Sequence, residues 1–334
     1  MVGREFAAVR LALSAVMIFL IHGGARGEPC QLKQVASLDV AADSDGNPLV
    51  PISIENSSGY FIFDPSAPVS VINRSAANSV HLQPQTIPGW MSVNYNGAHA
   101  GFVGYASIKL GSAAGSTLFA ILDGNVGNDP KAAGVLAYDV LKHFDIELDL
   151  AHNKINLFSQ DHCPGQVVYW TRTAAIAAVP MEIVQHSDFN IPVQIDGKDV
   201  KAQISMTAPY TLLHRHIARL TFGLDSSDAG IAQDKNDRAG DAPADRGNAY
   251  AFHTLSLNGI TISNPVIYPY GRDTYYICNG STHEEPPPPH SEMRQMVTCY
   301  GESEAYLGRS VLKQLRIFLA LKERMLYATA ANAQ

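Results

Sequence analysis

The chain contains two copies of one pattern, and this repeat constrains the fold more than any other feature of the sequence. The segment VPISIENSSGYFIFDPSAPVSVINRSAANSVHL, which begins at Val50, aligns without a gap with IPVQIDGKDVKAQISMTAPYTLLHRHIARLTFGL, which begins at Ile191. Alternating apolar and polar residues predict two strands in each copy, joined by a turn at the polar pair Asn56-Ser57 or Asp196-Gly197. A short apolar strand and a helix-like run follow.

A second matched pair closes each half of the chain. Residues 134–158, GVLAYDVLKHFDIELDLAHNKINLF, resemble residues 305–328, AYLGRSVLKQLRIFLALKERMLYA. Each segment predicts a strand, a short helix and a β-hairpin. Two copies are too few for a solenoid. The repeat therefore predicts an all-β protein with short helices, folded as two lobes over residues 28–165 and 166–334.

The second lobe is longer than the first by about thirty residues. The matched positions are 72 residues apart in the first half, from Asp64 to Leu136, and 102 apart in the second. Two stretches are candidates for the extra residues: the polar run from Ala232 to Asn248, and the loop from Cys278 to Cys299 that contains HEEPPPPH. The proline run predicts a stiff, polyproline-like loop tip.

The first 27 residues are expected to be a secretory signal peptide rather than part of the fold. Arg4 and Arg10 precede an apolar run from Leu11 to Ile21, and Ala25-Arg26-Gly27 provides a site of the small-x-small type, so cleavage is expected near Gly27. The run is too short to span a bilayer, although a signal anchor is the alternative. The mature protein is expected to be secreted or periplasmic, with no membrane attachment.

Four cysteines follow the signal peptide, and an even number in an oxidising compartment predicts two disulfides. Three pairings are possible. Cys30 and Cys163 bracket the first lobe, and Cys278 and Cys299 bracket the proline-rich loop. The repeat therefore favours Cys30–Cys163 and Cys278–Cys299. A zinc site is the weaker reading, because the sequence has no C-x₂-C pair.

Several function classes find no support in the sequence. The net charge is −7, and no run of Lys or Arg occurs, which argues against a nucleic-acid partner. The chain has no G-x-G-x-x-G, no Walker loop and no G-x-S-x-G elbow. No cofactor and no metal are expected, and the mature protein is expected to be a monomer.

One short motif follows an apolar strand in each copy of the repeat. The first copy reads FIF-Asp64-Pro65-Ser66-Ala67, and the second reads QI-Ser205-Met206-Thr207-Ala208. A duplicated β-lobe with this motif resembles the aspartic peptidases, and it looks like the bacterial exported branch with two retropepsin-like lobes in one chain. The resemblance covers residues 30–330. It implies two pepsin/retropepsin-like barrels around a central cleft, in which an extended peptide would lie.

The chain departs from that family at the positions that carry the chemistry. In the family each lobe supplies Asp-Thr-Gly, and two carboxylates about 3 Å apart share one proton and act as general base and general acid. Here Asp64 is present, but its counterpart is Ser205, which is no substitute for a carboxylic acid. The motif-flanking residues differ as well: Pro65 and Met206 replace the threonines, and Ser66 and Thr207 replace the glycines.

These departures predict a pseudo-peptidase that binds an extended peptide or protein segment in the cleft. One alternative is an active aspartic-type endopeptidase that uses Asp64, and another is a structural envelope protein. Asp64 itself has a purely structural reading, as a carboxylate that caps its turn by accepting backbone hydrogen bonds. Trp90 and Tyr95 lie where the family places a flap hairpin, and they are expected either to contact a ligand or to pack against the lobe.

Overall fold

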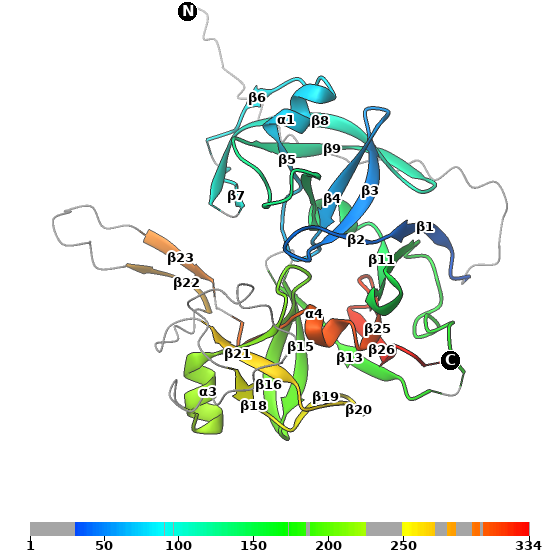
Figure 1. The fold of residues 1–334 in the computed structure, drawn as a ribbon, viewed down its shortest axis with the longest axis vertical. Coiled ribbons are helices and arrows are strands. Elements are labelled where there is room, and N and C mark those ends of the chain that lie inside the picture. The colour runs from blue at the N-terminus through cyan, green and yellow to red at the C-terminus, as the bar shows by residue number, and fades with distance from the viewer. Residues whose placement is uncertain are drawn as a thin grey trace, which may run out of the picture.

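The computed structural model describes residues 31–89, 91–95, 97–172, 174–184, 188–224, 249–270, 279–284, 296–300 and 303–333. Within these ranges the chain is mainly β, with short helices. Each half of the chain forms one large sheet, and a third sheet takes strands from both halves (Figure 1). The prediction of an all-β, two-lobed fold is confirmed.

The N-terminal sheet follows the first copy of the repeat. In spatial order its strands are β2 (Ala41–Ala42), β3 (Pro48–Ile54), β4 (Ser57–Phe63), β10 (Ala132–Leu136), β5 (Val71–Asn73), β9 (Ala113–Leu122), β8 (Ala98–Leu110) and β6 (Gln85–Thr86), with β7 (Asn94–Tyr95) paired to β8.

The C-terminal sheet repeats the same plan. In spatial order its strands are β18 (Tyr250–Ala251), β21 (Val266–Tyr270), β17 (Thr211–His214), β24 (Ala305–Leu307), β16 (Lys198–Ile204), β15 (Asp188–Ile195), β19 (Thr254–Leu257) and β20 (Ile260–Ser263), with β14 (Glu182–Val184) paired to β15. A separate hairpin, β22 (Asn279–Glu284) with β23 (Met296–Tyr300), projects from this lobe in Figure 1.

Short helices follow matched strands in the two lobes. They are α1 (Arg74–Ser79) and α3 (Arg215–Phe222) after β5 and β17, and α2 (Tyr138–Leu141) and α4 (Arg309–Leu312) after β10 and β24. Asn73 caps the start of α1, because its side chain accepts a hydrogen bond from the Ala76 N–H. Asparagine is one of the preferred residues at this position. A single 3₁₀ turn, Leu150–His152, completes the set within the described ranges.

The hairpins at the start of each repeat turn as their sequences predict, with one shift. The turn between β15 and β16 is Asp196-Gly197, and both residues have positive φ. In the first lobe the turn is Glu55-Asn56 rather than Asn56-Ser57, because Ser57 already pairs with Ile54. A two-residue hairpin turn of this type needs positive φ at both central positions, which Asn tolerates better than Ser.

The third sheet joins the two halves of the chain. In spatial order its strands are β1 (Gln34–Asp39), β12 (Lys154–Phe158), β11 (Asp145–Asp149), β25 (Leu315–Ala320), β26 (Met325–Ala330) and β13 (Ala177–Pro180). At its centre, Ile146 pairs with Leu319 and Leu148 pairs with Ile317. Glu147 pairs with Phe318, its own counterpart in the repeat, so the local two-fold axis passes between these two residues.

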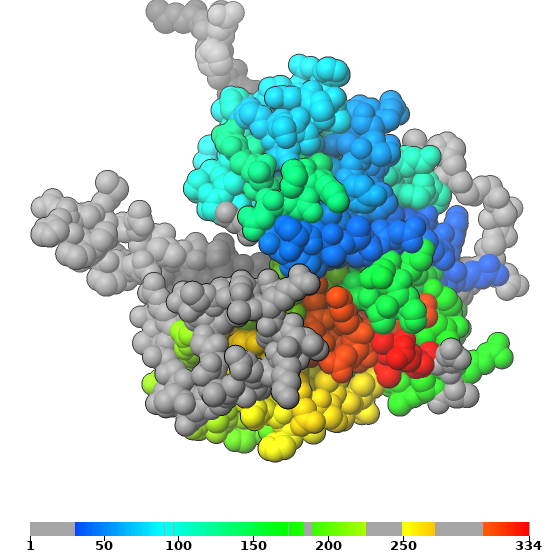
Figure 2. Space-filling view, viewed as in Figure 1, coloured from blue at the N-terminus to red at the C-terminus, as the bar shows by residue number. Residues whose placement is uncertain are grey.

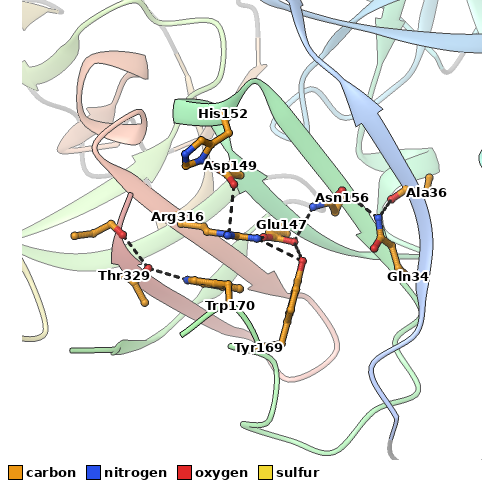
Figure 3. Close-up of polar contacts among 11 residues, drawn as sticks. Gln34, Ala36, Glu147, Asp149, His152, Asn156, Tyr169, Trp170, Arg316 and Thr329 are labelled. Carbon is orange, nitrogen blue, oxygen red and sulfur yellow. Dashed lines mark hydrogen bonds and ion pairs between the residues drawn. The ribbon is translucent and has the colours of Figure 1, made fainter. Parts of the chain in front are cut away.

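A buried polar network surrounds Glu147 at this axis (Figure 3). Its side chain is fully buried, and its Oε1 accepts a hydrogen bond from Arg316 Nε at 2.6 Å. Its Oε2 accepts hydrogen bonds from Asn156 Nδ2 at 2.9 Å and from the Tyr169 hydroxyl at 2.7 Å. The Arg316 guanidinium also lies 4.6 Å from the ring centre of Trp170. Arg316 and Glu147 therefore connect β25 with β11 by charge as well as by backbone pairing.

One apolar core runs through both lobes and the shared sheet, and smaller clusters lie beside it. Figure 2 shows the N-terminal half, in blue and cyan, packed directly on the rest of the molecule. Among the described residues, no helix has both the length and the apolar character needed to cross a bilayer.

Several sequence predictions fall outside the described residues. Residues 1–30, which include the signal peptide and Cys30, are among them, as are Trp90, Cys278 and the run from Ala232 to Asn248. The Cys299 side chain is likewise not described. The signal peptide and the two disulfide pairings therefore remain predictions.

Replacing Arg316 with Leu is expected to lower the free energy of unfolding by about 3–5 kcal/mol, because it leaves the buried Glu147 carboxylate without its cation. The double variant Glu147→Leu/Arg316→Leu is expected to lose less than the two single losses combined. Urea denaturation of the wild type, the two single variants and the double variant measures both quantities. Arg74→Leu is the control, since its ion pair with Asp123 is solvent-exposed and should be worth less than about 1 kcal/mol. Equal losses for Arg316→Leu and Arg74→Leu would contradict the proposed importance of the network.

Candidate functional site

Asp64 and Ser205 occupy the same position in the two lobes. Asp64 follows β4 and Ser205 follows β16. The Asp64 N–H donates to the Leu136 carbonyl at 3.1 Å, and the Ser205 N–H donates to the Leu307 carbonyl at 3.0 Å. This matched bond arises because in each lobe the strand before the motif runs parallel to a later strand, β10 or β24. The structure therefore places a carboxylate in one lobe at the position that a hydroxyl occupies in the other.

The Asp64 carboxylate is bound by its own turn. Asp64 is only 5% exposed. Its Oδ1 accepts hydrogen bonds from the Ser66 hydroxyl at 2.6 Å and from the Ser66 N–H at 3.1 Å. The neighbouring Pro65 is buried, and the Ala67 N–H closes the turn on the Asp64 carbonyl at 3.2 Å. The Ser66 hydroxyl therefore holds the Asp64 carboxylate, and a glycine at this position would have no hydroxyl to do so.

Burial raises the pKa of Asp64 above its ordinary value, although the hydrogen bonds from Ser66 and Ala67 partly oppose this. An isolated buried carboxylate loses hydration, and this loss penalises its ionised form. In a two-aspartate site the second carboxylate would raise one pKa by like-charge repulsion. Here burial, rather than a second acid, is the main cause.

The corresponding turn of the second lobe is closed without a charge. The Ser205 Oγ accepts a hydrogen bond from the Ala208 N–H at 3.2 Å. Met206 is fully buried, whereas Thr207 and Ala208 are partly exposed. The Ser205 hydroxyl thus satisfies a backbone donor of its own turn. This turn can supply hydroxyl groups to a ligand, but it cannot supply an ionised base.

Arg309 joins this turn to the N-terminal lobe, and sequence reasoning did not single it out. Its guanidinium is buried, and Nη1 donates to the carbonyls of Met206 and Thr207 at 3.1 and 2.8 Å. Across the lobe boundary, Nη1 donates to Asn47 Oδ1 at 3.0 Å and Nη2 donates to the Asp45 carbonyl at 2.8 Å. One buried arginine therefore links the Ser205 turn to the N-terminal lobe.

The counterpart of Arg309 in the first lobe also crosses the lobe boundary. That residue is Tyr138, the first residue of α2, and its ring packs edge-on against Phe189 of the second lobe with centroids 5.7 Å apart. Both residues make the same backbone bond, because the Tyr138 N–H donates to the Ala67 carbonyl and the Arg309 N–H donates to the Ala208 carbonyl, each at 2.9 Å. One contact is aromatic and the other is polar, although the backbone plan is shared.

A second asymmetry lies behind the two turns. In the first lobe, the Asp139 carboxylate accepts hydrogen bonds from the N–H and hydroxyl of Ser70, and the Ser70 hydroxyl accepts one from the Ala137 N–H. In the second lobe Ser310 stands in place of Asp139, and its buried hydroxyl has no hydrogen-bond partner. The second lobe has the counterpart of the last of these bonds, because the Gly308 N–H donates to the Thr211 hydroxyl at 3.2 Å, but Ser310 supplies no carboxylate to extend it.

The predicted flap is a short hairpin of β7 with β8, and Tyr95 lies on it. Tyr95 packs against the apolar cluster that includes Ile62 and Ala67. Burial raises the pKa of Tyr95, and the negative charges of Asp64 and Asp43 raise it further. Tyr95 thus packs beside the Asp64 turn, and its contact with a ligand stays a prediction. Trp90 is not described, so its role stays a prediction.

The Asp43 carboxylate also points inward, but its contacts are those of a closed turn. It accepts hydrogen bonds from the N–H groups of Asp45 and Asn47 at 2.9 and 2.7 Å, and from Asn47 Nδ2 at 2.9 Å. Asp43 thus holds the conformation of the Asp43–Asn47 loop, to which Arg309 donates hydrogen bonds. Across the described ranges, no three His, Cys, Asp or Glu side chains group as metal ligands would.

Replacing Asp64 with Asn is expected to raise the melting temperature at pH 7. The folded-state pKa lies above the unfolded value of about 3.9, so ionisation costs the folded state stability at higher pH. The difference between the two proteins should therefore vanish below about pH 3.9, grow between that pH and the folded-state pKa, and stay constant above it. Thermal melts across this pH range measure it. The exposed Asp39→Asn is the control, and a destabilised Asp64→Asn at pH 7 would contradict the assignment.

Replacing Arg309 with Met is expected to lower the free energy of unfolding by more than about 2 kcal/mol, because several buried acceptors lose their donor at once. Hydrogen exchange in the Asp43–Asn47 loop should also speed up, since the link to the second lobe is gone. Urea denaturation and exchange mass spectrometry give the two readouts. Arg172→Met, at an exposed position, is the control; the same result for both variants would show that Arg309 does not join the lobes.

Comparison with solved structures supports a pepsin-like fold. Basic 7S globulin from soybean matches with a TM-score of 0.52 at 13% sequence identity, over 90% of this chain and 99% of that chain. Conglutin gamma, a basic 7S globulin from lupine seeds, matches with a TM-score of 0.53 at 12% identity, over 90% of this chain and 95% of that one. Both neighbours have the two-lobed pepsin-like fold. At such low identity the likeness extends to the fold alone.

No family model matches the sequence, and no curated protein matches it either. The pepsin-like fold expected from the two motifs is thus confirmed by structure. The assignment to a bacterial exported branch has no support from these comparisons and remains a prediction.

Proposed function

We propose that this protein is an exported pseudo-peptidase of pepsin-like fold that binds an extended peptide or protein segment between its lobes. The observation that carries the proposal is the matched pair Asp64 and Ser205, which share one backbone position and one hydrogen-bonding pattern. Aspartic peptidases need an ionised and a protonated carboxylic acid together. A hydroxyl in place of one acid removes a role that commonly contributes about 10²–10⁴ in rate.

The proposed ligand is extended because both lobes are built from strands. An extended peptide can add main-chain hydrogen bonds to an exposed strand or hairpin, and side-chain pockets then give selectivity. The β7–β8 hairpin with Tyr95 is the proposed contact from the first lobe. Ser66 and Thr207, both partly exposed next to the matched pair, are the proposed contacts at the centre. The protein is proposed to act as a monomer, without cofactor or metal, after export.

An active endopeptidase that uses Asp64 is the second candidate, and one observation favours it. The raised pKa of Asp64 is a property that general acids need near neutral pH. This candidate still requires a second, ionised carboxylate that takes a proton from the attacking water. A structural envelope protein that has no ligand between its lobes is the third candidate.

Cleavage of a peptide library from about pH 3 to pH 8 separates the first two candidates. The wild-type chain and Asp64→Asn are both expected to leave the library intact. Cleavage by the wild type that disappears in Asp64→Asn would establish the endopeptidase and end the pseudo-peptidase proposal. Ser205→Asp is the informative third protein, since it places a second carboxylate at the matched position.

Capture of proteins from the native secreted fraction separates binding from a purely structural role. Ser66→Trp and Thr207→Trp are expected to lose partners that the wild type retains, because a bulky ring fills the proposed central contact. Ser79→Trp, at an exposed position at the end of α1, is the control and should retain them. Identical partner sets for all four proteins would refute peptide binding between the lobes.

A further inference from the structure

Two adjoining hollows lie on the second lobe, and none of their lining residues belongs to the Asp64 or Ser205 turns. The larger has a volume of about 620 Å³ and the smaller about 410 Å³. They share Pro180, Pro192 and Asp199, so they form one continuous groove beside the hairpin of β15 and β16. Each volume falls in the range of about 300–1,000 Å³ that is typical of ligand pockets.

A buried amide lines the larger hollow. Asn190 is only 8% exposed, and its Oδ1 is buried with no hydrogen-bond partner. Leaving such an atom unsatisfied costs free energy, so its presence calls for an explanation. The matched residue of the first lobe is Leu49, which packs in an apolar cluster. The second lobe thus places a polar group where the shared fold accepts a leucine.

Gln203, the cross-strand partner of Asn190, is also a polar residue where the first lobe has an apolar one. Asn190 pairs with Gln203 across β15 and β16, whereas in the first lobe Leu49 pairs with Ile62. Gln203 is engaged, since it accepts a hydrogen bond from the Ser303 hydroxyl at 2.8 Å. Asn190 Oδ1 is left as the acceptor that a ligand could satisfy, after rotation of the amide about χ2.

The lining of the groove is acidic. Glu182, Asp199 and Glu304 supply three carboxylates, and Lys201 supplies one ammonium group. Lys201 Nζ lies 2.7 Å from Glu182 Oε2, and the Lys201 N–H donates to Glu304 Oε2 at 2.7 Å. Three acids against one base leave the ionised lining with two excess negative charges.

Apolar residues line the groove together with these charges. Pro180, Met181 and Pro192 line the larger hollow, where Glu182 and Glu304 also lie, whereas Asp199 lines both hollows. This arrangement matches a molecule with hydrogen-bond donors and positive charge at both ends of an aliphatic stem. The overall charge of −7 would further attract such a molecule.

We propose that this groove binds a small linear aliphatic dication, such as a diamine or a guanidino-amine. One cationic end lies near Glu304 and Glu182 and donates to the Asn190 amide. The stem packs on Pro180 and Pro192, and the other end reaches Asp199. The proposal does not depend on the function proposed for the Asp64 and Ser205 turns.

Isothermal titration calorimetry of the purified chain with agmatine and with putrescine tests the proposal. The expected result is saturable binding at one site, weaker in 0.15 M salt than at low salt, because screening at that ionic strength acts over about 8 Å. The neutral analogue 1,4-butanediol should give no saturable heat. Absence of saturable heat with both amines would overturn the proposal.

Three variants locate the binding. Asn190→Leu, which introduces the residue of the first lobe, should raise the melting temperature and weaken agmatine binding at least tenfold. Glu304→Gln should weaken it at least tenfold, and Glu182→Gln gives the same test if Glu304→Gln does not fold. Asp39→Asn makes the same charge change at a side chain that is 83% exposed on β1, and it should leave affinity unchanged.

Unchanged affinity in the groove variants would overturn the assignment of the site. A blocked Gly-Arg-Gly peptide provides the remaining arm of the experiment. Agmatine is expected to bind more tightly than this peptide. Peptide binding more than tenfold tighter than agmatine would overturn the proposed ligand, because it would assign the groove to a basic side chain of a partner protein.

Discussion

The pairing of β11 with β25 is the interaction on which the rest of this structure depends. These two strands come from opposite halves of the chain, and they are counterparts in the repeat. Glu147 pairs with its own counterpart, Phe318, so the sheet carries the local symmetry axis. Both lobes are connected to this shared sheet. The register of β11 against β25 therefore sets where the Asp64 and Ser205 turns lie.

The same axis shows how far the two copies have diverged. At the axis the fully buried Glu147 carboxylate pairs with the aromatic residue Phe318. Arg316, two residues before Phe318 on β25, compensates the carboxylate's charge. At the boundary of the lobes, Tyr138 makes an aromatic contact where Arg309 makes polar ones. A shared backbone plan has thus been retained while the side chains on each side of it took different roles. The fold is therefore compatible with a carboxylate at this position in one lobe and a hydroxyl in the other.

Divergence also distributes polar groups unevenly between the lobes. The first lobe has the buried acid Asp64 and the partly buried acid Asp139, each held by a serine of its own lobe. The second lobe has Ser205 and Ser310 at these positions, and carries its polar groups instead at Asn190 and Gln203, where the first lobe is apolar. The two lobes therefore offer different chemistry on matched surfaces, and the groove beside Asn190 is lined by residues of the second lobe.

The repeat in the sequence was sufficient to predict the strands, the two lobes and the matched positions of Asp64 and Ser205. These features depend on short-range patterns, in which alternation sets a strand and a polar pair sets a turn, and each pattern occurred twice. Sequence could not identify Arg309, Ser66 as the holder of Asp64, or Asn190. The bond from Ser66 to Asp64 is local, across two residues, but the sequence had suggested only backbone donors for that carboxylate. The roles of Arg309 and Asn190 arise from contacts with residues that are distant in the chain or from burial, as when Arg309 reaches Asn47 across the lobe boundary. Such contacts exist only once the shared sheet has brought the two halves together, and hydrogen-bond partners follow from that geometry rather than from local sequence.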